Sequence, residues 1–140
     1  MVEYRYQVTI SAQPDQIWKV MTDFETYGEW NDFYRKIVTK GGDGDRIRMH
    51  VTLGSLRVIS IEKIRNLEDN KSLGWGLDNF LMHTGVDRSL TIVDEDRTQV
   101  SSVFKATGAL SRLAMPLFGN QIQAGMENFL DCLKRRVENS

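Results

Sequence analysis

The sequence predicts an α+β fold in which a curved antiparallel sheet grips one long C-terminal helix. Two patterns support this prediction. Within residues 109–137, apolar residues recur at steps of three and four, which is the spacing of one helical face. Before that stretch, short runs alternate apolar and polar side chains, as strands with one buried face do. The runs follow one another across short turns, without the strand–helix alternation of a parallel sheet.

The chain opens with an alternating run at residues 4–10, which predicts the first strand. Pro14 then favours the start of a helix. Proline has no backbone N–H, and the N–H groups in the first turn of a helix have no hydrogen-bond partner within the helix. Residues 17–21 give this helix an apolar side, and a second short helical segment is predicted at residues 25–30.

Six further strands are predicted at residues 34–40, 46–53, 56–64, 72–77, 84–93 and 98–107. Glycine-rich or acidic turns separate most of them, for example residues 41–45 and 94–96. The alternation is cleanest in the strand at 46–53. One side of it is apolar and the other polar, with Ile47, Met49, Val51 and Leu53 opposed to Arg46, Arg48, His50 and Thr52.

Pro116 interrupts the C-terminal helical pattern, since a proline inside a helix removes a backbone hydrogen bond and clashes with the preceding turn. We expect a break or kink within residues 115–119 and a long regular helix at 119–138. The joint near Pro116 is where we expect a ligand to enter.

Length and charge limit the classes of function. At 140 residues the chain is expected to form a single domain spanning 1–140. The 18 basic and 19 acidic residues give a net charge of −1, so no nucleic acid is predicted as a partner, although a local basic patch remains possible. Cys132, His50 and His83 are too few to predict a disulfide or a metal site, and no metal or other cofactor is predicted.

The N-terminal residues show no signal-peptide pattern, and no apolar run approaches the ~20 residues that span a bilayer. We therefore expect a cytoplasmic protein without stable membrane insertion, either a monomer or a weak dimer.

Several segments resemble one superfamily over essentially the whole chain. They are Ile10-Ser11-Ala12-Gln13-Pro14-Asp15-Gln16-Ile17-Trp18, then Asp23, Tyr27 and Trp30, Leu73 with Trp75, residues 88–92, Thr98, Gly108, and residues 133–138. This set resembles the START and polyketide cyclase/dehydrase superfamily, often called SRPBCC. The resemblance implies a helix-grip fold, with a seven-stranded antiparallel sheet curled around the C-terminal helix and two short helices after strand 1. It also implies a cavity for an apolar ligand.

Members of this superfamily include lipid carriers, polyketide cyclases, coenzyme Q-binding proteins, plant allergens and chaperone activators, so the fold does not select a function. The cavity wall has to decide. We expect the ligand-binding residues to be Trp30, Met49, Val51, Trp75, Arg88, Leu90, Phe104, Leu117 and Met126.

Arg88 is the most informative polar candidate. If Leu90 and Ile92 point inward, strand parity brings Arg88 and Thr84 to the same face. A buried arginine would require an anionic or carbonyl partner, for which Glu62 and Asp78 are candidates. The alternative is an arginine at the end of the strand that reaches solvent.

No catalytic set is assigned. Arg88, Tyr34 and His83 are the candidates for acid–base work, which requires hydrogen-bond reach to a substrate. His83 and Asp87 share the opposite parity from Arg88, so both should face outward unless a bulge reverses the register.

Three functions remain open from the residues. The first is binding or transport of a hydrophobic small molecule, such as a lipid, a polyketide or an isoprenoid-like compound, with Arg88 orienting its polar end. The second is an enzyme of the aromatase/cyclase or dehydratase type that uses no metal. The third is a protein-binding regulator that uses the outer face of the sheet or the exposed short helices.

Overall fold

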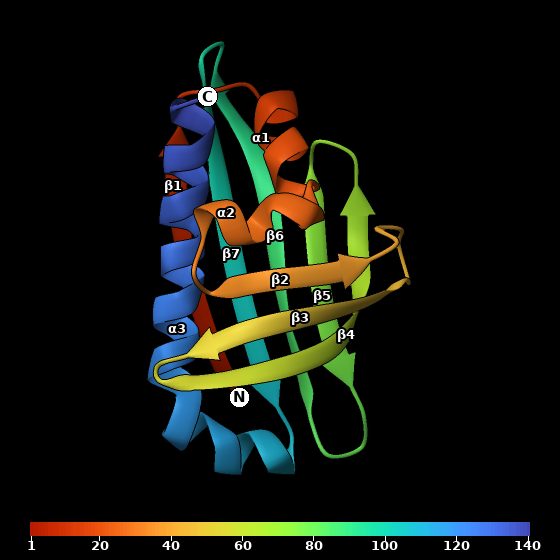
Figure 1. Cartoon of the computed structure of the whole chain (residues 1–140). Coiled ribbons are helices and arrows are strands. Elements are labelled where there is room, and N and C mark those ends of the chain that lie inside the picture. The colour runs from red at the N-terminus through yellow and green to blue at the C-terminus, as the bar shows by residue number, and fades with distance from the viewer.

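The computed structural model describes residues 1–140, whose seven strands form one antiparallel sheet (Figure 1). The strands are β1 (Val2–Ile10), β2 (Tyr34–Thr39), β3 (Arg46–Leu53), β4 (Leu56–Glu68), β5 (Ser72–Asp78), β6 (His83–Asp94) and β7 (Arg97–Thr107). Their order is β1-β7-β6-β5-β4-β3-β2, so β2 to β7 form a meander and β1 closes it beside β7. The predicted α+β architecture is confirmed.

The helices are α1 (Pro14–Met21), η1 (Phe24–Thr26), α2 (Tyr27–Trp30) and α3 (Ala109–Glu138). Pro14 opens α1 as predicted, and the Gln13 N–H donates to Gln16 Oε1 at 2.9 Å, which satisfies one backbone donor of the helix start. The predicted helical segment after α1 corresponds to η1 and α2 in direct succession.

The sheet curls strongly. Figure 1 shows β2 and β3 crossing in front of β6 and β7, while the long strand β4 bends from one direction into the other. The register between β4 and β5 shifts between Arg65 and Glu68, and an irregularity of this kind allows a strand to bend. Because of this curl, the inner face of the sheet encloses a space that is bordered by α3 and by strands from both ends of the sheet (Figure 1).

The break or kink predicted near Pro116 is a bend and not an end of the helix (Figure 1), because α3 is one helix of 30 residues that begins at Ala109 and contains Pro116. The predicted start of the long helix at residue 119 is therefore wrong. A proline removes a single backbone bond and pushes against the preceding turn, and a helix can accommodate both by bending. Figure 1 shows the first turns of α3 running at a steep angle to the rest of the helix. No helix combines the length and the apolar composition that a membrane crossing requires.

The C-terminal half of α3 fills the space inside the curled sheet. Phe129, Leu130 and Leu133 are fully buried there, and each such side chain stabilises the fold by roughly 1.5–3 kcal/mol. Gly125 brings the helix close to the loop before β2, since a Cβ at this position would lie 2.1 Å from the Phe33 ring. Only glycine permits this contact.

Candidate functional site

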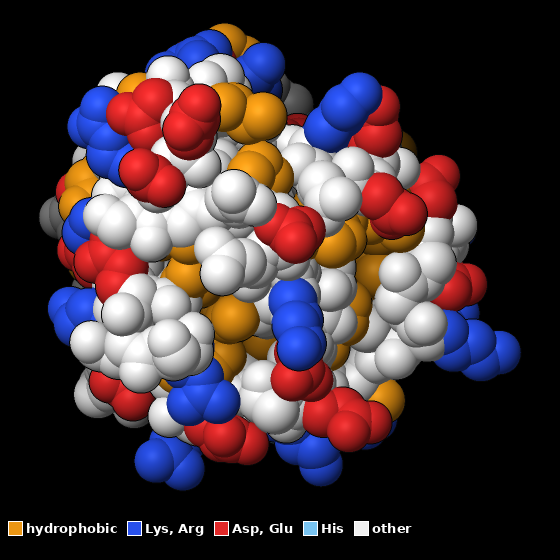
Figure 2. Space-filling view, turned by 90° about the horizontal axis from the view of Figure 1, so that it is seen from above, with side chains coloured by type: hydrophobic (Ala, Val, Ile, Leu, Met, Phe, Trp, Pro, Cys, Tyr) orange, Lys and Arg blue, Asp and Glu red, His pale blue; other side chains and the backbone are white.

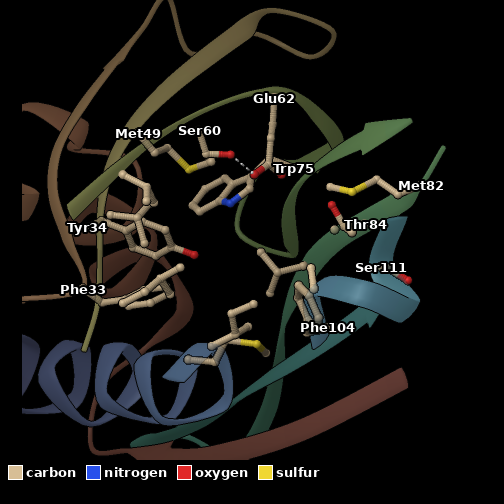
Figure 3. Close-up of a pocket in the computed structure, with 18 of the residues that line it drawn as sticks. Phe33, Tyr34, Met49, Ser60, Glu62, Trp75, Met82, Thr84, Phe104 and Ser111 are labelled. Atoms are coloured by element: carbon tan, nitrogen blue, oxygen red, sulfur yellow. Dashed lines mark hydrogen bonds between the residues drawn. The ribbon is translucent and has the colours of Figure 1, made fainter. Parts of the chain in front are cut away.

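A cavity of about 260 Å³ lies between the first half of α3 and the inner face of the sheet (Figure 3). Nineteen residues line it, of which 14 are hydrophobic. They are Phe33, Tyr34, Met49, Val51, Leu53, Val58, Ser60, Glu62, Trp75, Met82, Thr84, Gly85, Val86, Phe104, Ser111, Ala114, Met115, Ile122 and Met126. Such a wall suits an apolar ligand that is fixed by a few polar contacts.

Strand alternation explains which side chains reach the cavity. Met49 on β3 lies opposite Ser60 on β4, and Ile47 lies opposite Glu62. Since neighbours across a ladder share a face, the polar side chains of Ser60 and Glu62 enter the cavity beside the apolar side of β3. The cavity wall thus changes from apolar to polar over one pair of strands.

Glu62 is the one carboxyl group among the residues that line the cavity. The Ser60 hydroxyl donates to Glu62 Oε2 at 2.7 Å (Figure 3). Burial raises the pKa of Glu62, and this effect outweighs the Ser60 hydrogen bond and the positive charges of Arg65 and Arg88, which lower it. The cavity therefore shifts this carboxyl group toward its protonated form, the form that can donate a hydrogen bond to a ligand.

Arg88 is buried, with 1% of its surface exposed. Its guanidinium carbon lies 4.2 Å from the centre of the Phe129 ring, 5.1 Å from Trp75 and 5.6 Å from Tyr34. These distances allow cation–π attraction, which strengthens away from water. Nε and Nη1 have no hydrogen-bond partner, while Nη2 donates to the Tyr34 hydroxyl at 3.2 Å.

The Tyr34 hydroxyl connects this cation with the cavity. Figure 3 shows it pointing from β2 into the open space, with the Trp75 ring nearby. Because the hydroxyl oxygen accepts from Arg88, its own proton remains available for a ligand oxygen. Arg88 is not among the cavity-lining residues, so it acts on the cavity through Tyr34.

The structure brings together most of the predicted ligand-binding residues. Those that line the cavity are Met49, Val51, Trp75, Phe104 and Met126, and the acid–base candidate Tyr34 joins them. Arg88 and Leu90 share the inner face of β6 as strand parity predicts, but Leu90 packs against the core outside the cavity. Ile92, which is expected to point inward with them, is instead 67% exposed near the end of the strand. The solvent-reaching alternative for Arg88 is wrong.

Two other predicted positions lie elsewhere. Leu117 is 69% exposed, because the cavity face of α3 passes through Ser111, Met115 and Met126, and Leu117 falls on another side of the helix. Trp30 packs against Tyr27 and Phe129, with ring centres 5.1 and 5.2 Å away, and is not among the residues that line the cavity.

The predicted outward orientation of His83 and Asp87 matches the structure. His83 is exposed and its Nδ1 lies 2.9 Å from Asp78. Asp87 contacts Arg65 and Asn66 on the outer side of the sheet. Asp78 also pairs with Arg65, and neither Asp78 nor Glu62 forms an ion pair with Arg88.

Sequence reasoning considered Glu62 only as a partner for Arg88 and overlooked it as a residue of the cavity. The alternation of β4 could have found it, since Val58, Ser60, Glu62 and Ile64 occupy every second position. Phe33 and Ala114 carry no comparable pattern, because a loop and the bent start of α3 place them. No group of three or more His, Cys, Asp or Glu side chains is arranged to hold a metal ion.

The family model described as polyketide cyclase/dehydrase and lipid transport matches residues 1–138. The chain belongs to this family. No curated protein matches the chain in sequence.

Several solved structures share the fold at low sequence identity. The Zhui aromatase/cyclase from a Streptomyces species has a TM-score of 0.81 and 17% identity, covering 99% of this chain and 94% of that chain. A START superfamily protein from Mycobacterium smegmatis has a TM-score of 0.79 and 17% identity, covering 98% and 97% of the two chains. Norcoclaurine synthase from Thalictrum flavum has a TM-score of 0.74 and 14% identity, covering 99% and 87%.

These likenesses establish the helix-grip fold. The family supports two kinds of function for this chain, binding of a hydrophobic ligand or chemistry of the polyketide cyclase type. The side chains that line the cavity have to decide between these two functions.

Proposed function

We propose that this protein binds a compact hydrophobic molecule that has an oxygen at one end, and that Tyr34 and Glu62 hold this oxygen. The supporting observation is one cavity wall that is mostly apolar but contains a hydroxyl backed by a buried cation. Its volume of about 260 Å³ lies at or below the low end of the ~300–1,000 Å³ typical of ligand sites. A molecule of two or three fused rings fits this space better than a long acyl chain.

The polar groups determine which end of the ligand goes where. Tyr34 donates its hydroxyl proton, and a protonated Glu62 donates another, so a phenolic or carbonyl oxygen satisfies both. The remaining surface of the ligand contacts Met49, Trp75 and Phe104. Arg88 acts as a positioning residue, since its hydrogen bond orients the Tyr34 hydroxyl.

We place ligand access between the β5–β6 loop and the first turns of α3. The Leu110 N–H donates to the Leu81 carbonyl at 2.9 Å, so the two segments meet, and Met82 and Ser111 from these segments line the cavity. Phe80 is 94% exposed and Leu113 is 71% exposed at the same end, which gives an apolar ligand a surface to approach.

Isothermal titration with 2-naphthol and naphthalene tests this proposal. Wild-type protein should bind both compounds, and 2-naphthol more tightly. Tyr34→Phe should weaken binding of 2-naphthol by about tenfold, since a lost hydrogen bond costs roughly 1.5 kcal/mol, and should leave naphthalene unchanged. If 2-naphthol bound no more tightly than naphthalene, and Tyr34→Phe did not weaken its binding, the role of Tyr34 in holding the ligand oxygen would be refuted.

A second candidate function is an intramolecular aldol cyclase, which a cavity carboxyl group with a raised pKa, Glu62, favours. In such a step, an enol carbon of a bound poly-β-ketone adds to a ketone carbon of the same chain. The ketone oxygen takes the Glu62 proton, and the enol O–H proton returns to the carboxylate, so the carboxyl group is regenerated.

Product analysis with a synthetic poly-β-ketone thioester distinguishes the carrier from the cyclase. The cyclase candidate predicts ring formation above the uncatalysed rate that Glu62→Gln reduces at least a hundredfold. Ser60→Ala is the control, because it removes the hydrogen bond to Glu62 but leaves the acid. If the protein bound the thioester but did not accelerate its cyclisation, the cyclase candidate would be rejected in favour of ligand binding.

A further inference from the structure

The outer face of β2, β3 and β4 concentrates positive charge. Across the ladder, Lys36 lies opposite His50, and Arg46 lies opposite Lys63. Arg35 Nε donates to the outward hydroxyl of Thr52, which pairs with Arg57. We call this the basic outer face, and it comprises Arg35, Lys36, Lys40, Arg46, Arg48, His50, Arg57 and Lys63.

Carboxylates do not neutralise this face. Along β2, β3 and the β4 residues paired with β3, the one carboxylate is Glu62, which points into the cavity. Asp43 and Asp45 in the neighbouring turn accept backbone N–H groups of Leu67 and Gly42. The basic outer face is therefore a local exception in a chain whose net charge is −1.

None of the arginines and lysines of this face forms an ion pair. On other parts of the surface, cations such as Arg65, Arg97 and Lys134 do pair with carboxylates. Figure 2 shows the end of the molecule near the C-terminus, where acidic and basic side chains are interspersed. Unpaired cations gathered on one face create a positive potential that attracts an acidic partner.

Apolar side chains lie among these cations. Ile59 is 60% exposed, Ile61 50% and Val38 44%, although each belongs to a regular strand. Val38 and Ile61 border a surface hollow of about 520 Å³, whose other walls are Thr39, Lys40, Asp45, Arg46 and Arg48. Arg48 lies between Val38 and Ile61 across the ladder, so apolar and cationic side chains alternate on this face and can meet both apolar and acidic groups of a partner.

The pKa of His50 is sensitive to the positive charges that surround it on this face. Its Nε2 is buried without a hydrogen-bond partner. Partial burial lowers the pKa of His50, and repulsion from Arg48, Lys36 and Arg35 lowers it further. The neighbouring charges therefore act on one another, as uncompensated cations do.

We propose that the basic outer face docks an acidic protein surface, whose carboxylates pair with these cations and whose apolar side chains contact Val38, Ile59 and Ile61. Nucleic acid fits less well, because this face has no Phe, Tyr or Trp side chain to stack on bases, and Ile59 would lie against a charged backbone. This site is separate from the cavity and does not depend on the proposed ligand.

A synthetic amphipathic helix with leucines along one face and glutamates on either side tests the proposal. Titrated into isotope-labelled protein at low salt, it should shift the amide signals of β2–β4 and the ring signals of His50, leaving the His83 ring unchanged. Arg48→Glu/Lys63→Glu should weaken binding at least tenfold. The matched charge reversal Lys19→Glu/Arg112→Glu, on helices away from this face, should change it less than twofold.

The same titration identifies competing occupants. Poly-L-glutamate should bind more weakly than the helix, because it lacks the apolar side chains. Equal weakening by both double variants, or no binding of the helix, would overturn the proposal. So would tighter binding of a DNA duplex or of phosphatidylglycerol vesicles at the same salt, or a salt-sensitive dimer in sedimentation. The binding of 2-naphthol should be unchanged in Arg48→Glu/Lys63→Glu, which separates this site from the cavity.

Discussion

The two faces of β3 have opposite characters although their residues alternate along one strand. Ile47, Met49 and Val51 are buried, and the last two line the cavity. Arg46 and Arg48 on the outer face are exposed and form no ion pair. The difference teaches that strand alternation can give one strand a wall of an apolar cavity on one side and a charged, solvent-exposed surface on the other. Changes at adjacent residues should therefore have separable effects.

The largest expected difference is between Met49→Ala and Arg48→Ala. Met49 is 1% exposed, so its truncation leaves a larger void and should lower the free energy of unfolding by about 2–5 kcal/mol. Arg48→Ala removes an exposed side chain and should change it by less than about 0.5 kcal/mol. Urea denaturation of both variants measures the difference. Similar losses would contradict the assignment of the two faces.

Arg88→Met should separate stability from binding. Methionine fills similar space without burying an unpartnered charge, so the unfolding free energy should rise or fall by less than about 1 kcal/mol. The affinity for 2-naphthol should fall about tenfold, because the Tyr34 hydroxyl loses its donor. Arg65→Met is the control, since Arg65 pairs with Asp78 and Asp87 on the outer side and should not affect binding. Unchanged affinity in Arg88→Met would refute the positioning role.

Glu62→Gln should change how stability depends on pH. Burial raises the pKa of Glu62 in the folded state above the ordinary value near 4.5. The folded protein then holds a proton that the unfolded chain releases, so the unfolding free energy falls as the pH rises from 4.5 through the raised pKa. Glutamine does not ionise, and denaturation at pH 4.5 and 7.5 should show a smaller fall in the variant. Parallel pH profiles would contradict the burial of this carboxyl group.

The smallest expected effect belongs to Ile59→Thr/Ile61→Thr on the outer face. Both side chains are at least half exposed, and threonine is compatible with a strand, so stability should change by less than about 0.5 kcal/mol per site. Binding of the acidic amphipathic helix should nevertheless weaken. A large loss of stability would show that these residues are part of the packed structure and not of a free surface.

Much of the fold follows from local patterns in the sequence. The period-two alternation located all seven strands, because each has one buried face, and Pro14 located the start of α1. The predicted start of the long helix at residue 119 is wrong for a physical reason, since Pro116 bends α3 without ending it (Figure 1). The sequence shows that a backbone bond is lost there, but whether the helix stops or bends depends on the surrounding contacts.

The site was less predictable than the fold. Strand parity correctly brought Met49, Trp75 and Arg88 to the inner face, since parity is a local property. Leu117 lies outside the cavity, because the rotation of α3 about its axis depends on packing. Whether an inward residue borders the cavity or the closed core, as Leu90 does, also depends on distant segments.

Ligand binding in the cavity is the central claim, and a matched pair of neighbouring substitutions tests it most directly. Ala114 lines the cavity, whereas Leu113 next to it is 71% exposed. Calorimetry with 2-naphthol should show that Ala114→Trp, which fills the cavity, abolishes binding and that Leu113→Trp retains the wild-type affinity within about twofold. Binding that survives in folded Ala114→Trp protein would contradict the claim that the ligand occupies this cavity.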